Sequence, residues 1–147
     1  MPRKAISVDL SRFDDHFAPA VITTGELVIK LAPPPSANHL WRANHKSKRM
    51  YRSKSYSAWL TYSHLTVGRP GRFDKPVAVR LSFYGGKGFR KGRDLDNCEK
   101  AIMDFLQHCG VIEDDNYDCV PKIVKTYYPP ASAKAKAYVR VAVRRIA

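Results

Sequence analysis

The sequence predicts an α/β domain of two layers, built from a mixed β-sheet of about four strands and two main helices. The chain has 147 residues, the size of a single domain, and its apolar content of 44% is normal for a globular protein. Segments with a two-residue apolar repeat alternate with segments whose apolar residues recur every three or four positions. The predicted order is strand, helix, strand, helix, strand, strand, which is typical of helices layered on a sheet.

Composition narrows the functional class. The net charge is +13, which favours a nucleic-acid partner. No apolar run is long enough to span a membrane, and no signal peptide is recognisable. The three cysteines, Cys98, Cys109 and Cys119, contain no C-x-x-C pair, so we expect free thiols in a reducing cytoplasm.

The first strand is predicted at residues 26–31, where Leu27, Ile29 and Leu31 share one face. Residues 1–24 mix charges, proline and alanine without periodicity, and we interpret them as an N-terminal extension to a domain at 25–147. Three consecutive prolines in residues 32–37 end the strand.

Residues 38–53 form a polar, basic segment that also contains Trp41 and Tyr51. Cations interleaved with aromatic rings suit contact with phosphates and stacking on bases. A solvated loop whose rings pack inward is the alternative. The predicted DNA-binding cations are Arg42, Lys46, Lys48, Arg49 and Arg52.

A first helix is predicted at about residues 54–66, with Ser53 as its N-cap and Gly68 after its end. Tyr56, Trp59, Leu60 and Val67 give it a buried face. The strand predicted next, at residues 76–84, buries Val77, Val79, Leu81 and Phe83.

The following loop, residues 85–93, is glycine-rich and basic, and it leads directly to Asp94. It is not a Walker A loop, because no Lys-Ser/Thr pair follows the glycines. Its glycines would let the backbone approach a phosphate closely, so we predict a DNA contact, with a solvated loop as the alternative. Its cations are Lys87, Arg90, Lys91 and Arg93.

Eight of the thirteen acidic residues lie in residues 94–118. Asp94 and Asp96 share a face if the segment is extended. A second helix is predicted at about residues 97–109, capped by Asp96 or Asn97, with Asp96 and Glu99 as a capping box and Gly110 at its C-terminal end. Its apolar stripe comprises Ala101, Ile102, Phe105, Leu106 and Cys109.

The acidic residues invite two interpretations. Taken singly, acids at a helix start and in the turn at residues 114–116 are ordinary structural choices. If the segment after the second helix, residues 111–115, folds back so that three or four carboxylates converge, they need a cation or a shared proton. Two carboxylates about 4 Å apart repel by around 4 kcal/mol at an effective dielectric of 20. Hard oxygen ligands favour magnesium or manganese.

The last two strands are predicted at residues 120–128 and 137–146. Pro121 places the first of them at a sheet edge. The second alternates Val139, Val141 and Val143 with Arg140 and Arg144.

The central acidic stretch reads D-L-D-N-x-x-K-x-x-x-D and then G-V-x-x-D-D, and an earlier segment reads P-P-S-A-N. These motifs resemble the RusA family of Holliday-junction resolvases, small metal-dependent endonucleases of bacteria and their phages. The resemblance covers about residues 26–146. The matching positions are Asp94, Leu95, Asp96, Asn97, Lys100, Asp104, Gly110, Val111, Asp114 and Asp115.

The resemblance implies roles for particular residues. Asp94, Asp96 and Asp115 would be catalytic metal ligands, with Asp114 as a less certain fourth. Lys100 would be needed for cleavage, and Lys125 falls where the family often has a lysine, which we assign to DNA contact. Asn38 and Asn97 would order the active site. The N-terminal extension and the glycines of residues 85–93 depart from the smallest family members.

The resulting hypothesis is a Mg²⁺-dependent (or Mn²⁺-dependent) endodeoxyribonuclease with one or two ions, which resolves four-way junctions by paired nicks and leaves 5′-phosphates. A junction with near-twofold symmetry argues for a homodimer. We expect a cytoplasmic protein encoded by a bacterium or phage. The alternatives are a nuclease of the same fold that cuts flaps or other branched DNA, a basic DNA-binding protein without catalysis, and an RNA-binding protein.

Overall fold

The computed structural model describes residues 21–23, 25–74, 76–89 and 92–146. Within these residues a five-stranded sheet has the order β1-β2-β7-β5-β6. Its strands are β1 (Val21–Thr23), β2 (Glu26–Leu31), β5 (Val77–Tyr84), β6 (Lys122–Tyr128) and β7 (Tyr138–Arg145). The β5–β6 pair is parallel and the other pairs are antiparallel, so the sheet is mixed, as predicted.

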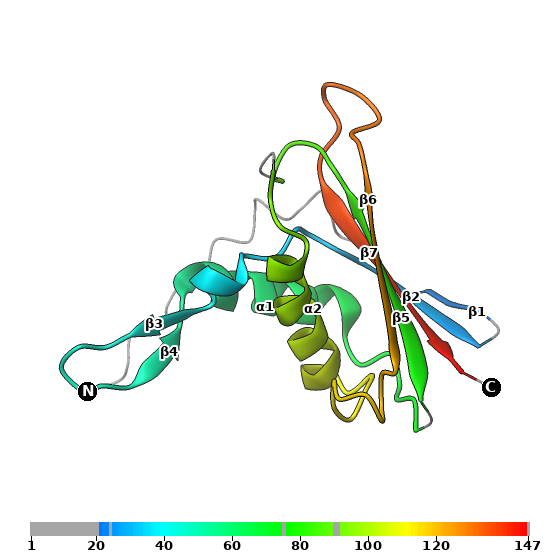
Figure 1. Ribbon diagram of the computed structural model, residues 1–147, viewed down its shortest axis with the longest axis horizontal. Coiled ribbons are helices and arrows are strands. Elements are labelled where there is room, and N and C mark those ends of the chain that lie inside the picture. Colours follow the sequence, from blue (N-terminus) through cyan, green and yellow to red (C-terminus); the bar gives the residue numbers. More distant parts are fainter. Residues whose placement is uncertain (1–20, 24, 75, 90–91, 147) are drawn as a thin grey trace.

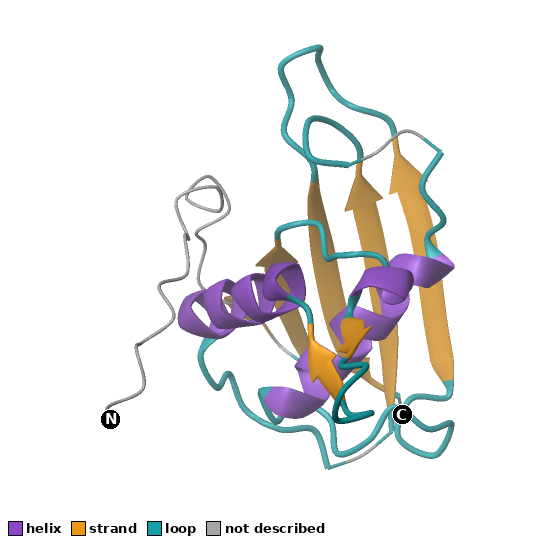
Figure 2. Ribbon diagram, turned by 90° about the vertical axis from the view of Figure 1, so that its left-hand side faces the viewer, coloured by secondary structure: helices purple, strands orange, loops and turns teal. Residues whose placement is uncertain are grey.

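Two helices, α1 (Lys54–Val67) and α2 (Asp96–His108), cover one face of this sheet (Figures 1 and 2). Parallel strands need a crossover connection, and α2 lies in the crossover from β5 to β6. The two-layer α/β prediction is therefore confirmed. The sheet has one strand more than the four expected, because the three-residue β1 pairs with β2.

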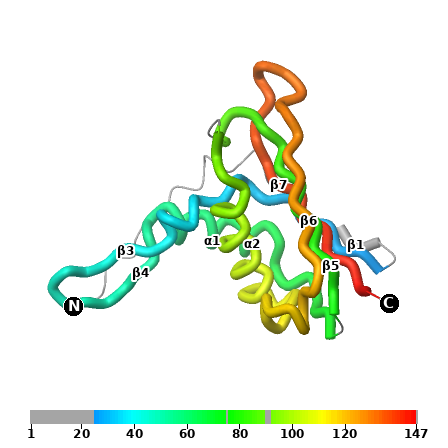
Figure 3. The backbone as a smooth tube through the Cα atoms, viewed as in Figure 1, coloured from blue at the N-terminus to red at the C-terminus, as the bar shows by residue number. Residues whose placement is uncertain are grey.

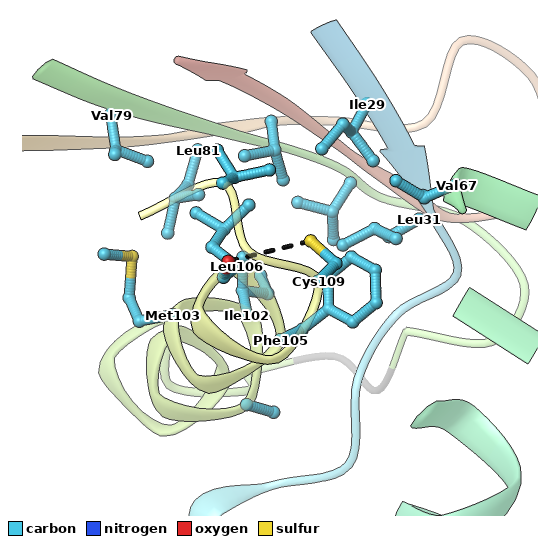
Figure 4. Packing of buried hydrophobic residues seen from close by; sticks show 14 of the residues in the cluster. Ile29, Leu31, Val67, Val79, Leu81, Ile102, Met103, Phe105, Leu106 and Cys109 are labelled. Carbon is cyan, nitrogen blue, oxygen red and sulfur yellow. Dashed lines mark hydrogen bonds between the residues drawn. The ribbon is translucent and has the colours of Figure 1, made fainter. Parts of the chain in front are cut away.

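The core lies between the sheet and the helices, and it consists of the side chains that the apolar repeats predict (Figure 4). Ile29, Leu81, Ile102 and Phe105 are fully buried. Trp59 of α1 links α2 to the segment after β2, because its Nε1 donates to the carbonyl oxygen of Ala32 (2.8 Å) and its ring packs edge-on against Phe105 of α2. The position of α2, and hence of the acids at its two ends, is fixed by this core.

The N-terminal end of α1 matches its prediction. Ser53 is the N-cap, and its Oγ accepts a hydrogen bond from the backbone N–H of Tyr56 (3.2 Å). The capping box predicted for α2 is wrong. Leu95 is the N-cap and makes no side-chain cap, because Asp96 is already helical and the Glu99 carboxylate bonds to Lys125 instead.

Residues 38–53, described from the sequence only as a polar and basic segment, contain regular secondary structure. A short 3-10 helix η2 (Ala37–His39) leads into an antiparallel hairpin of β3 (Trp41–Ala43) and β4 (Met50–Arg52). Every residue in these two strands is exposed, and the hairpin extends away from the sheet beyond the helices (Figure 3). We call the β3–β4 hairpin the arm.

Residues 1–20, 24, 75, 90–91 and 147 fall outside the described part of the chain, so the proposed domain boundary at residue 24 stays a prediction. In the described part no helix is long and apolar enough to cross a membrane.

Candidate active site

Asp94 and Asp96 meet at the start of α2, and both are exposed. The backbone N–H of Asp96 donates to Asp94 Oδ1 (3.0 Å). Leu95 between them has helical dihedral angles, so the extended geometry assumed from the sequence is wrong. The carboxylate of Asp94 folds over the first turn of the helix, and this local hydrogen bond places the pair.

Lys125, on strand β6, contacts one member of this pair, Asp96. Its Nζ forms an ion pair with Asp96 and another with Glu99, at 3.3 Å. The hydrogen bond that Lys125 donates to Asp96 raises the Lys125 pKa, burial opposes this, and the hydrogen bond that it donates to Glu99 adds to the rise. Lys125 therefore stays charged, and its contact with DNA remains a prediction.

Lys100 lies one helical turn further along α2. Its Nζ bonds to Asp104 Oδ1 at 3.1 Å. This hydrogen bond is the main cause of a raised Lys100 pKa, which burial opposes and to which the charge of Asp115 also contributes. The segment after α2 contacts the last turn of the helix, where Gln107 Nε2 donates to Asp114 Oδ1.

Asp114 and Asp115 are neighbours in sequence but have different surroundings. Asp114 Oδ1 accepts bonds from Gln107 Nε2 (3.3 Å) and from the backbone N–H of Asp115 (2.7 Å), and its Oδ2 accepts from Asn116 Nδ2 (3.1 Å). These bonds tie the turn to α2, which gives Asp114 a structural role. The Asp115 side chain is exposed.

The acids do not form one cluster. Among the described residues, no three side chains of His, Cys, Asp or Glu are placed together to hold a metal ion. The exposed carboxylates of Asp94 and Asp96 nevertheless fit Mg²⁺, which is usually held by one or two carboxylates together with water and substrate phosphate. Asp115 lies outside that pair.

The segment before the arm contacts Arg93 and α2, which lie next to the acid pair or carry it. Arg93 donates a hydrogen bond to the backbone oxygen of Pro34, and η2 packs against α2. Asn38 is exposed in η2, where its N–H bonds to Ser36 Oγ (3.4 Å). Asn97 is half-buried in the first turn of α2. Both predicted ordering residues are thus on elements beside the acids.

The arm carries a set of cations and two exposed aromatic rings. Trp41 is 44% exposed and Tyr51 52%. At the tip, Asn44 Oδ1 accepts from the backbone N–H groups of Lys46 and Ser47, which closes the turn. All five predicted cations are exposed: Arg42, Lys46, Lys48, Arg49 and Arg52.

The basic loop after β5 lines a large pocket, which we call the aromatic pocket, with a volume of about 1010 Å³. Two of its four predicted cations, Arg90 and Lys91, lie outside the described residues, while Lys87 and Arg93 line the pocket. Its other lining residues are Gly86, Phe89, Gly92, Leu95, Tyr127, Pro130, Ser132 and Ala133. No sequence pattern predicts this pocket, because its walls come from segments that are far apart in the chain.

Comparison with known families gives one match. The family model described as Endodeoxyribonuclease RusA matches residues 31–143, which include every acid and lysine of the site described above. No curated protein matches the chain.

Proposed function

The chain belongs to the RusA family of endodeoxyribonucleases, and from this premise we propose that it resolves four-way DNA junctions by paired, symmetric, metal-dependent nicks. The observation that carries the proposal is the exposed pair Asp94 and Asp96, with Lys125 against Asp96, on a chain of net charge +13. A site that cuts a polyanion needs carboxylates for a metal and surrounding cations to bring phosphate to them.

Asp94 and Asp96 would hold Mg²⁺ or Mn²⁺, and Asp115 would approach from the turn after α2. When bound, the ion supplies Lewis acidity and an activated water for in-line attack on phosphorus. The family resemblance implies a 5′-phosphate product.

The chain's own cations carry the remaining steps. Lys125 holds the Asp96 carboxylate in place through its ion pair. Lys100, fixed by Asp104 at 3.1 Å, would neutralise charge that develops on the phosphate in the transition state. The arm and Arg93 would bind the DNA phosphates on either side of the cleaved bond, so the affinity for DNA should fall steeply as the salt concentration rises.

A four-way junction has near-twofold symmetry, and two matched nicks need two sites. We therefore propose a homodimer with one site in each chain. We also propose a bacterial or phage origin and a cytoplasmic location, as the family implies.

The test is cleavage of a labelled synthetic four-way junction, compared with a flap and a plain duplex, in Mg²⁺. Asp96→Asn and Asp94→Asn should abolish paired nicks yet retain binding. Asp118→Asn is the matched control, because Asp118 is an exposed acid of the same acidic stretch outside the proposed pair. If the flap is cleaved in preference to the junction, the protein is a nuclease for branched DNA in general and not a junction resolvase. Binding without cleavage in Mg²⁺ or Mn²⁺ would refute catalysis.

A further inference from the structure

The aromatic pocket lies beside the acid pair. Its lining includes Arg93 and Leu95, which flank Asp94 in sequence. It also includes Tyr127, which is two residues from Lys125 on β6 and therefore on the same face of the strand. Since Lys125 contacts Asp96, a DNA strand at the acid pair has the pocket next to it.

Backbone hydrogen bonds and close packing join the two loops that contribute to the pocket lining. The N–H of Lys87 donates to Ala135 O (2.9 Å), and the N–H of Ala137 donates to Lys87 O (2.9 Å). Gly86 packs so tightly that a Cβ would lie 2.4 Å from Ala135 O. The glycines at 85 and 86 therefore serve packing between loops, whereas the sequence had indicated close approach to a phosphate.

The pocket presents flat rings and positive charge. The rings of Phe89 and Tyr127 are stacked at 6.0 Å with 26° between their planes, and Tyr127 is 45% exposed. The Arg93 guanidinium lies over Phe89 at 5.3 Å, and Lys87 adds a second cation. Among the described residues that line the pocket, none is acidic.

We propose that the aromatic pocket takes an unstacked nucleobase from the strand whose phosphate lies at Asp94 and Asp96. An aromatic wall offers a stacking surface to any base, and the cations bind the attached phosphates. This inference rests on the proposed function, because the strand has to pass the acid pair. A base held here would fix the register of the strand, and the pocket would thus contribute to the choice of cleavage position.

The experiment measures junction binding without divalent metal, by fluorescence anisotropy, for wild type, Tyr127→Leu, Tyr127→Phe and Tyr128→Leu. Tyr128 is the matched control, because it is 43% exposed but faces the opposite side of β6 and stacks on Tyr84. Each protein is tested on an intact junction and on junctions with one abasic nucleotide at successive positions around the scissile phosphate.

Tyr127→Leu should weaken binding to the intact junction by about five- to 150-fold, the range for losing one stacked base. Tyr127→Phe should bind like wild type, because it keeps the ring. At one abasic position the difference between wild type and Tyr127→Leu should disappear. Tyr128→Leu should stay within about twofold of wild type, because Tyr128 lies outside the pocket lining.

The inference is overturned if Tyr127→Leu loses the same factor at every abasic position, or if Tyr128→Leu loses as much as Tyr127→Leu. Thermal melts of the variants separate a binding defect from a folding defect. Cleavage in Mg²⁺ is assayed separately, so that the two proposals can fail independently. If the loss of binding in Tyr127→Leu depends on the abasic position but no cleavage occurs, the nuclease proposal is refuted and the base-binding pocket stands. If the junction is cleaved but the loss of binding is the same at every abasic position, the pocket proposal is refuted and the nuclease stands.

Discussion

Gly85→Ala tests how the aromatic pocket is built. A Cβ at this position would lie 2.2 Å from the Tyr127 hydroxyl oxygen and 2.9 Å from its Cζ. Normal contact requires the ring to retreat by about 1 Å or more. Gly85 is not among the glycines with positive φ, so alanine itself fits the backbone.

The expected cost follows from moving the Tyr127 ring. Leaving its preferred rotamer costs about 0.5–1.5 kcal/mol, and losing the stacking with Phe89 costs about as much again. The free energy of unfolding should therefore fall by about 1–3 kcal/mol. For a chain of this size each kcal/mol lowers Tm by roughly 2–4 °C.

A double-mutant cycle with Tyr127→Ala makes this prediction specific, because the smaller side chain removes the clash. In the Tyr127→Ala background, Gly85→Ala should be neutral or stabilising by up to about 1 kcal/mol, since alanine restricts the unfolded chain. The new Cβ would also lie 3.1 Å from Pro130 Cδ, so the proline ring has to move only slightly.

Gly86→Ala is the control for this cycle. Its Cβ would meet the Ala135 backbone, and its φ is +145°, so Tyr127→Ala should not rescue it. Urea denaturation of the single and double variants measures the cycle. Equal costs of Gly85→Ala in both backgrounds would refute the reasoning.

Three further predictions concern the acidic segment and the arm. Lys125→Met should lower the free energy of unfolding by about 1 kcal/mol, because it removes the ion pairs with Asp96 and Glu99. Since the folded protein raises the Lys125 pKa, these pairs stabilise the fold fully below the ordinary lysine pKa of about 10.4. In urea denaturation, the difference in stability from wild type should therefore be constant from pH 7 to 9 and smaller at pH 11. Asp114→Ala should cost about 1–3 kcal/mol in thermal melts through its lost hydrogen bonds, whereas Asp115→Ala should stay within about 0.5 kcal/mol; equal effects would contradict the division of roles. Lys46→Ser and Lys48→Ser should each reduce the salt slope of DNA binding by about 1 without changing Tm, as anisotropy titrations at several salt concentrations would measure, and an unchanged slope would exclude the arm from phosphate contact.

Local patterns were enough to predict most of the fold. The buried faces of β2, β5 and β7 follow directly from their alternating apolar residues, and α1 begins where Ser53 indicates. The arm could not be predicted in this way, because strands exposed on both faces leave no alternation in the sequence. β1 was missed because three residues are too few for a periodic pattern.

Contacts between distant segments explain what the sequence did not predict at the site. Asp94 and Asp96 were predicted to lie together because they are two residues apart. The pairing of Lys125 with Asp96 depends on how β6 is placed beside α2, which no local pattern specifies. The same holds for Phe89 and Tyr127, whose rings come from a loop and a distant strand.

These contacts also change the electrostatic argument for a metal. Three or four converging carboxylates would require a cation or a shared proton to offset their repulsion. Lys125 already supplies one for Asp96 and Glu99, and Lys100 supplies another for Asp104. Repulsion alone is therefore no argument for Mg²⁺. Support for Mg²⁺ comes instead from the exposed carboxylates of Asp94 and Asp96, of which Asp94 forms no ion pair in the described part of the chain, and from the family to which the chain belongs. Any divalent ion at Asp96 is repelled by the ammonium of Lys125, so Lys125→Met should tighten Mn²⁺ binding in calorimetric titrations, and weaker binding would contradict this account.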